Sequence, residues 1–487
     1  MLDQTFSYRN FQIVYTRESR IGNIPKDSLG EGYVRTLKEL QANREQLHTL
    51  KKKKRAEWTD EEAILSDQLR EKEKTLLKQR QEELTLYVRK LAELVNSKDF
   101  RFKLATITIG DKTGYRLDAE KKDYTQFFAM KQLQYNLQRT FKVKQANRHL
   151  IMSNLKLLLT TRRPFYLIRA DVSSFFESIP HSQLLPMIMD NTLLSHKSKM
   201  FIKAILNEYE RVKVKADETT TDACGLPRGV AISSLLSEIY MRDLDNKIKH
   251  RMEVTYYARY VDDIVIILSD IPDCSSIEQY YRDLSKRFSE YGLTLKDLTT
   301  EKGIAIDFTQ SLPEASVFTY LGYEIRIFKI GEKKSKGIEA SYSMSHHKID
   351  RIHKRIDNAF SRFDRMSKHN VHVARRGLID ALKLIVGNIK LQNAKSRVKV
   401  GIYYNNDLLD NMENLRNLND YLWSREVHPY EKLFKNKGER EAFIGKLKTR
   451  IQKFDFKKAW EERKIYDISS KRVRLIMKWL NYEKEEA

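Results

Sequence analysis

The chain has 487 residues, with 90 Lys and Arg against 66 Asp and Glu, which gives a formal net charge of +24. This length permits two to four structural units, and the positive surplus is typical of a protein that binds a polyanion, nucleic acid first of all; an ordinary basic soluble protein is the alternative. Two cysteines exclude a disulfide framework or a four-cysteine zinc site. The N-terminus lacks a signal-peptide pattern, and no stretch approaches the ~18 apolar residues of a membrane span. We therefore expect a cytoplasmic protein with no membrane partner.

A helical hairpin arm is predicted for residues 37–98, after an N-terminal segment of residues 1–36. The stretch contains no Gly or Pro, and its leucines recur on one stripe in each half. The helical pattern is interrupted near Trp58, where Thr59 or Asp60 can cap the second helix. The basic run Lys51–Arg55 could contact phosphates, although such runs are more often a solvated face. The sequence leaves the role of this arm open.

Strand candidates alternate with helical stretches over residues 99–330, which predicts an α+β fold. Residues 104–109 and 115–117 are expected to form a hairpin around a turn at residues 110–114. Few strand signals follow residue 341, and residues 349–397 carry helical spacing with basic polar faces. Residues 331–487 are therefore expected to be mainly helical.

Residues 254–268 predict two strands with neighbouring carboxylates at the turn between them. Alternating residues up to Tyr260 precede Asp262 and Asp263, and an apolar run resumes at Ile264. Paired aspartates are costly to bury unless a cation or hydrogen bonds offset their repulsion, and a divalent metal ion does so directly. An ordinary surface turn is the alternative.

A third carboxylate follows a strand candidate at residues 165–170. Asp171 comes directly after this strand and before a helix expected from Ser182, so it can face the same site as the hairpin tip. Three carboxylates suit Mg²⁺, which prefers hard oxygen ligands together with substrate phosphates. Phosphoryl transfer with two metal ions requires such an arrangement.

A glycine-bounded turn at residues 225–229 is expected to open a helix from about Ser233. Glycine lets the backbone approach a ligand closely, and a helix N-terminus favours phosphate. This signal is weak by itself.

In their order and spacing, these segments resemble the palm motifs of reverse transcriptases over about residues 101–328. The resemblance rests on Asp171 with Phe176, the segment Leu226–Ser233, the RYVDD segment Arg259–Asp263, residues 292–295 with Lys302, and residues 318–323. It implies a right-hand polymerase with fingers and palm at residues 99–330 and a helical thumb and C-terminal region at residues 331–487. The implied activity is RNA-directed DNA synthesis from dNTPs.

The resemblance also implies the roles of individual residues. Asp171, Asp262 and Asp263 would be catalytic and would hold two Mg²⁺ ions, or Mn²⁺ in their place, with help from the backbone of Val172. Phe176 would be the aromatic gate that excludes a 2′-hydroxyl, with an ordinary core phenylalanine as the alternative. The remaining expected nucleotide contacts are Arg228, Gly229, Lys112 and Arg116. For Lys112 and Arg116, the alternative of two solvated turn residues is about as good. The expected primer or template contacts are Tyr260, Val261, Leu321, Gly322 and Lys302.

Three departures from the general family pattern narrow the resemblance. Arg228 stands where many members have Gln, Ser234 replaces a common Pro, and Glu238 replaces a common Asn. With the SFFESIPH form of residues 174–181, this pattern resembles the abortive-infection and defence-associated branch of prokaryotic reverse transcriptases. The opening residues and residues 386–404 resemble one subunit of the type 3 defence-associated system.

That branch implies phage defence by DNA synthesis, with an RNA template or non-coding RNA partner and a DNA product. A second reverse transcriptase subunit or a homo-oligomer is a further expected partner. A retron-like or mobile-element enzyme is one alternative, and a catalytically silent RNA-binding scaffold is another. The sequence does not give the template, the primer, the oligomeric state or the activation trigger.

Overall fold

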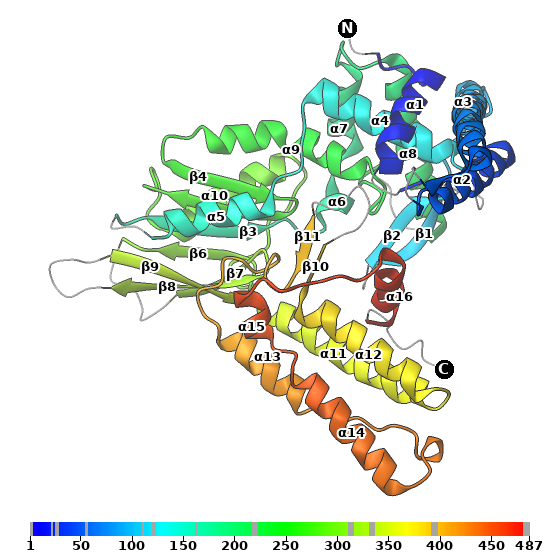
Figure 1. The fold of residues 1–487 in the computed structure, drawn as a ribbon. Helices are drawn as coiled ribbons and strands as arrows, with labels where there is room; N and C mark the ends of the chain where they lie inside the picture. Colours follow the sequence, from blue (N-terminus) through cyan, green and yellow to red (C-terminus); the bar gives the residue numbers. More distant parts are fainter. Residues whose placement is uncertain are drawn as a thin grey trace. The chain divides into compact units, whose positions relative to one another are not determined.

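The computed structural model describes the chain except for residues 1–2, 21–22, 25–28, 54–56, 110–111, 119–122, 161–162, 217–222, 310–315, 331–336, 391–397 and 481–487. Helices and antiparallel sheets are both present, so the α+β class is confirmed (Figure 1). The chain divides into two compact units, and each is described by itself. Unit 1 comprises residues 1–145, 172–248 and 285–294; unit 2 comprises residues 146–171, 249–284 and 295–487.

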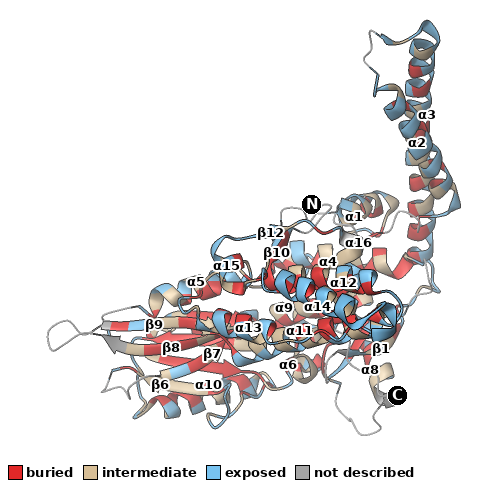
Figure 2. Ribbon diagram, turned by 60° about the horizontal axis from the view of Figure 1, so that its bottom comes forward, coloured by how far each residue is buried: buried red, intermediate tan, exposed pale blue. Residues whose placement is uncertain are grey.

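The N-terminal part of unit 1 is helical. Helix α1 (Tyr8–Arg20) contacts α3 (Asp60–Asn96), and α2 (Glu31–Leu50) packs along α3, as Figure 2 shows. Thr59 and Glu62 form a capping box at the start of α3, which explains why the long second helix begins there. Helix α2 begins at Glu31 rather than at residue 37. Lys54 and Arg55 of the basic run lie outside the described residues.

The rest of unit 1 contains the segments that are expected to bind a nucleotide. Strands β1 (Leu104–Ile109) and β2 (Lys112–Leu117) form the predicted antiparallel hairpin. The second strand begins at Lys112 instead of residue 115, so Lys112 is a strand residue and not part of the turn. The helices of this part are α4 (Thr125–Phe141), α6 (Phe175–Ser178), α7 (His181–Met189), α8 (His196–Ala216) and α9 (Ser233–Lys249).

Unit 2 contains a four-stranded antiparallel sheet in the order β4-β5-β3-β6. Its strands are β4 (Val254–Tyr260), β5 (Asp263–Leu268), β3 (Tyr166–Asp171) and β6 (Ile304–Asp307). Helix α5 (Arg148–Leu158) shares a hydrophobic core with this sheet through Leu155, Leu167 and Val265, all fully buried. Helix α10 (Ile277–Glu290) follows β5 in the chain. The core shared by α5 and the sheet fixes β3 and β5, the strands that carry Asp171 and Asp263.

A second antiparallel sheet of unit 2 is formed by β7 (Ser316–Tyr320), β8 (Tyr323–Ile330) and β9 (Gly337–Met344). The C-terminal helices are α11 (His346–Ser367), α12 (Val371–Val386), α13 (Glu413–Trp423), α14 (Lys437–Ile451), α15 (Phe456–Glu461) and α16 (Ser470–Leu480), with a 3-10 turn at Glu431–Leu433. They pack on the same core as the two sheets. None of the described helices is long and apolar enough to cross a membrane.

The helical prediction for residues 349–397 is wrong after Val386. Strand β10 (Asn388–Lys390) follows and pairs with β11 (Lys399–Gly401) and β12 (Ile465–Tyr466). The buried Asn388 side chain explains the change, because its Oδ1 accepts a 2.9 Å hydrogen bond from Tyr403 N. Residues 391–397 lie outside the described part.

Candidate active site

Two of the predicted catalytic aspartates face each other across neighbouring strands. Asp171 ends β3, Asp263 begins β5, and the antiparallel register makes them direct Cα partners. Asp171 is almost fully buried, with a relative exposure of 2%, whereas Asp263 is partly exposed. Asp262 precedes Asp263 in the turn from β4 to β5. The sheet register therefore brings the carboxylates of distant segments to one end of the sheet.

The turn that carries Asp262 has an unusual backbone. Val261 has φ 61°, a conformation that a β-branched residue rarely adopts. Tyr260 and Asp263 pair on either side of the two-residue loop, and a positive φ at its first residue matches the type II′ turn of tight hairpins. The carbonyl of Val261 accepts a 3.0 Å hydrogen bond from Arg259 Nη1. This contact holds the strained turn in place.

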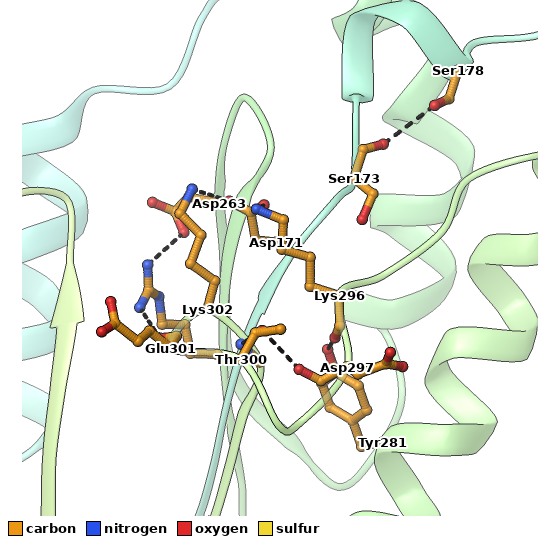
Figure 3. A network of polar contacts seen from close by, with 12 residues as sticks. Asp171, Ser173, Ser178, Asp263, Tyr281, Lys296, Asp297, Thr300, Glu301 and Lys302 are labelled. Carbon is orange, nitrogen blue, oxygen red and sulfur yellow. Dashed lines mark hydrogen bonds and ion pairs between the residues drawn. The ribbon is translucent and has the colours of Figure 1, made fainter. Parts of the chain in front are cut away.

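Two lysines bind the buried Asp171 carboxylate (Figure 3). Lys296 Nζ lies 2.7 Å from Oδ1, and Lys302 Nζ lies 2.7 Å from Oδ2. Both lysines come from the segment between α10 and β6, which is anchored because Lys296 N donates a 2.9 Å hydrogen bond to the carbonyl of Asp171. Burial lowers the pKa of Lys302, but its hydrogen bond to Asp171 and the three aspartate charges raise it on balance. The site thus places two cations on one buried carboxylate.

Arg169 supports Asp263 from the same strand as Asp171. Its Nη2 lies 3.3 Å from Asp263 Oδ1, and its Nη1 donates to the carbonyl of Glu301 and to Thr319 Oγ1. Burial raises the pKa of Asp263, Arg169 and Lys302 lower it, and the charges of Asp171 and Asp262 raise it again, with a net upward shift. Burial is therefore the main cause of the raised pKa of Asp263, and the charges of Arg169 and Lys302 oppose it.

The donor set fits a divalent cation in its chemistry. Carboxylates are the hard oxygen ligands that Mg²⁺ prefers, and Asp171, Asp262 and Asp263 supply three of them. Among the residues that the structure describes, no group of three or more His, Cys, Asp or Glu side chains lies at metal-binding spacing. In this arrangement the oxygens of Asp171 are bound by the lysines, so a metal ion would have to share or displace these contacts.

The expected primer-grip residues form a tight turn in unit 2. Leu321 and Gly322 connect β7 to β8 with φ 44° and 76°, and positive φ at both positions matches a type I′ turn. The Leu321 carbonyl accepts a 2.9 Å hydrogen bond from Arg148 Nε. A Cβ at Gly322 would approach Arg148 Nη2 to 3.2 Å. Arg148, to which the sequence assigned no role, therefore fixes this turn.

Phe176 and Arg228 lie together in unit 1. The guanidinium of Arg228 lies 5.4 Å from the Phe176 ring centroid and makes two hydrogen bonds of 3.0 and 3.1 Å to the Glu177 carboxylate. Phe176 is half-buried, whereas its neighbour Phe175 is fully buried. The gate role of Phe176 stays a prediction. The Arg228 guanidinium is bound by Glu177, and its expected contact with a nucleotide stays a prediction.

Backbone hydrogen bonds connect the other nucleotide-site segments of unit 1. Leu226 N donates to the Phe176 carbonyl at 2.6 Å, and Tyr115 N donates to the Arg228 carbonyl at 2.7 Å. The β-hairpin is thereby joined to the glycine turn, where Gly229 has φ 94°. Lys112 and Arg116 are exposed on β2, and their contact with a triphosphate stays a prediction.

The predicted site residues are divided between the two units. Unit 1 contains Val172, Phe176, Arg228, Gly229, Lys112 and Arg116, and unit 2 contains the three aspartates, Tyr260, Val261, Leu321, Gly322 and Lys302. Val172 directly follows Asp171 in the chain and is buried. Sequence reasoning missed Lys296 and Arg169. Lys296 directly follows the Gly292–Leu295 motif, and this position next to a recognised motif was the available signal.

Comparisons with known proteins identify one family over part of the chain. Residues 100–325 match the family model of reverse transcriptases, described as RNA-dependent DNA polymerases. No curated protein matches the chain. Among solved structures, apo telomerase from Candida tropicalis is 12% identical with a TM-score of 0.31, covering 100% of this chain and 90% of that one. Telomerase from Candida albicans with a telomeric RNA fragment is 10% identical with a TM-score of 0.32, covering 83% and 69%. Scores of this size describe a distant likeness only.

The family match spans every segment that carries an aspartate of the site. Asp171, Asp262 and Asp263 all lie within residues 100–325. These residues therefore form a reverse transcriptase domain, and the chain is an enzyme of the RNA-dependent DNA polymerase class.

Proposed function

We propose that this enzyme copies an RNA template into DNA from dNTPs by nucleotidyl transfer at Asp171, Asp262 and Asp263. The observation that carries the proposal is the register of β3 and β5, which places Asp171 directly opposite Asp263 with Asp262 in the adjoining turn. This arrangement supports carboxylate-held divalent ions rather than a surface turn.

The protein residues would mainly position and neutralise charge. Mg²⁺ held by the three carboxylates and the Val172 backbone would activate the primer 3′-hydroxyl and stabilise the leaving pyrophosphate. Lys296 and Lys302 would offset negative charge on the triphosphate once it lies beside Asp171. Arg169 would keep Asp263 oriented, because its Nη1 is itself fixed by hydrogen bonds to the Glu301 carbonyl and to Thr319 Oγ1.

We further propose a role in antiviral defence of a prokaryote, with a non-coding RNA as template or partner. Support for this role is the resemblance of residues 174–181, Ser234 and Glu238 to the defence-associated branch. Association with a second reverse transcriptase subunit or a second copy of the chain is part of the same proposal. Sequencing of nucleic acid that co-purifies from cells, with and without phage, tests it, because a covalent RNA–DNA species would point to a retron instead.

The synthesis proposal is tested with purified protein, labelled dNTPs, and either a primed homopolymer RNA or RNA co-purified from the host. We expect incorporation with Mg²⁺ or Mn²⁺, none with EDTA, and none for the double variant Asp262→Ala with Asp263→Ala. Asp270→Ala is the matched control, since this exposed aspartate follows β5 and should leave synthesis unchanged.

Synthesis by the double variant would overturn the assigned site. Absence of incorporation by the unaltered protein on both templates would instead favour the RNA-binding scaffold. The two results separate a wrong site from a wrong activity.

A further inference from the structure

A groove of about 420 Å³ lies between α1 and α3 in unit 1, before the residues that match the family. It is lined from α1 by Arg9, Gln12, Ile13, Tyr15, Thr16, Arg17 and Arg20, and from α3 by Gln81 and Leu84. We call this the α1–α3 groove. No role assigned above to the reverse transcriptase domain uses it.

The charge of the groove is positive and is not neutralised by ion pairs. Arg9, Arg17 and Arg20 are exposed, and none forms a salt bridge within the described part of the chain. Asp3 acts on Arg9 through its charge only, and Glu18 of α1 is bound 3.2 Å from Lys131. Arg9 and Arg20 are separated by eleven residues, or about 16 Å along the helix. That length corresponds to roughly five nucleotides of one strand.

Aromatic rings hold several guanidinium groups around the groove. Arg17 lies 4.5 Å from the centroid of the Tyr135 ring on α4, and Arg139 lies 5.3 Å from the same ring. Arg89 of α3 lies 4.8 Å from the Tyr8 ring centroid. Because these contacts already restrict the arginine side chains, the side chains lose less entropy when they bind a ligand. A planar guanidinium also matches the two free oxygens of a phosphodiester.

Neutral hydrogen-bonding groups lie between the arginines. Gln12, which lines the groove, donates through its amide nitrogen to Thr85 Oγ1 at 2.8 Å, and its amide oxygen is a further possible acceptor. Thr16 donates to the Gln12 backbone carbonyl and retains acceptor capacity. Gln81 is exposed on the opposite wall. A 2′-hydroxyl can donate to and accept from such groups, which distinguishes RNA from DNA.

We propose that the α1–α3 groove binds the sugar–phosphate backbone of an RNA strand. The arginines contact phosphates of the strand, and the amide and hydroxyl groups contact ribose. The inference rests on the proposed function, because an enzyme that copies RNA has an RNA partner. It adds an anchoring site outside residues 100–325, which match the reverse transcriptase family. An acidic protein segment would lack the ribose contacts.

The test measures binding of single-stranded uridine homopolymer RNA by the full chain across a salt series, using the Asp262→Ala, Asp263→Ala background so that binding is read without synthesis. We expect Arg9→Gln, Arg17→Gln and Arg20→Gln together to weaken binding at least about tenfold at low salt and to reduce the salt slope by about 2. The matched control is Arg44→Gln, Arg70→Gln and Arg211→Gln, which removes the same charge from arginines paired with Glu73, Asp67 and Glu208. The control should retain affinity and slope.

Unchanged affinity and slope in the groove variant would overturn the inference, as would equal loss in the control. Equal binding of thymidine homopolymer DNA or of polyglutamate at the groove would overturn the assignment to RNA. Arg20→Gln alone, at the exposed end of α1, gives a second reading if the triple variant misfolds. Incorporation of dNTPs by the groove variant with native aspartates is assayed separately, so failure of the polymerase proposal does not obscure this result.

Discussion

The guanidinium of Arg228 lies over the ring of Phe176, with its Cζ 5.4 Å from the ring centroid. The two residues are 52 positions apart, and the carboxylate of Glu177 binds the same guanidinium. Arg228 therefore acts within unit 1 as a support for the expected sugar gate. Since many family members have glutamine at this position, the pair offers a direct test of what the arginine adds.

Arg228→Gln should raise the KM for dNTPs about five- to tenfold with little change in kcat. The reason is that a cation–π contact and a half-exposed ion pair contribute about 1 kcal/mol together. Steady-state kinetics on a primed homopolymer check this. Glu177→Gln should produce a smaller change in the same direction, and an unchanged KM in both variants would contradict the supporting role.

Phe176→Ala should increase incorporation of ribonucleotides relative to deoxyribonucleotides by about tenfold or more, because the ring would no longer exclude the 2′-hydroxyl. Competition between labelled rNTP and dNTP measures the ratio. Phe175→Ala is the matched control: it should leave the ratio unchanged but destabilise the protein by about 3–5 kcal/mol, since Phe175 is fully buried. A loss of stability without altered selectivity in Phe176→Ala would show a core residue instead.

Lys296→Met should lower the Mg²⁺ concentration needed for half-maximal synthesis, because its ammonium group then no longer competes for Asp171 Oδ1. We expect a shift of about threefold or more, given that charged hydrogen bonds contribute on the order of 1 kcal/mol or more. A metal titration of initial rates measures it. Lys286→Met, at an exposed position of α10, controls for the loss of one charge, and an identical shift there would exclude local competition.

The stability of the protein should depend on pH through Lys348. Burial, followed by the charges of Arg148 and Arg351, lowers the pKa of Lys348 to about 7, against the opposing charge of Asp407. The unfolded chain, with an ordinary lysine pKa, binds more protons than the folded chain between about pH 7 and pH 10, so this residue makes the free energy of unfolding rise with pH across that window.

Lys348→Met should therefore raise the free energy of unfolding above that of the wild type most strongly near pH 7. This gain in stability should shrink by about 1–4 kcal/mol toward pH 10. Denaturant unfolding at several pH values measures it. Lys354→Met, an exposed lysine of α11, removes the same charge without the burial. A parallel pH dependence of both variants would contradict the role of burial.

The hairpin that carries Asp262 and Asp263 could be predicted from sequence because its signals are local. Alternation before Tyr260, the paired aspartates and the apolar run from Ile264 define two strands and a turn without any long-range information, and the structure has them at Val254–Tyr260 and Asp263–Leu268. The helix from Ser233 was likewise predicted at its observed start, because the glycine turn precedes it directly.

The partners of the aspartates could not be predicted in the same way. Lys296 and Lys302 reach Asp171 across more than a hundred residues, and only the fold decides which lysines of a basic chain do so. The strand at residues 388–390 was missed because it is held by Asn388 contacting Tyr403, a tertiary interaction that overrides helical spacing.

The pairing of Asp171 with Asp263 constrains how this protein can change over generations. Side chains alternate between the two faces of a strand, so gain or loss of one residue within β3 or β5 would send one carboxylate to the opposite face. Exchanges among Ile, Val and Leu in the same strands keep the alternation and are tolerated far better. Lineages of this enzyme should therefore vary freely in which apolar residues fill the strands while strand length stays fixed.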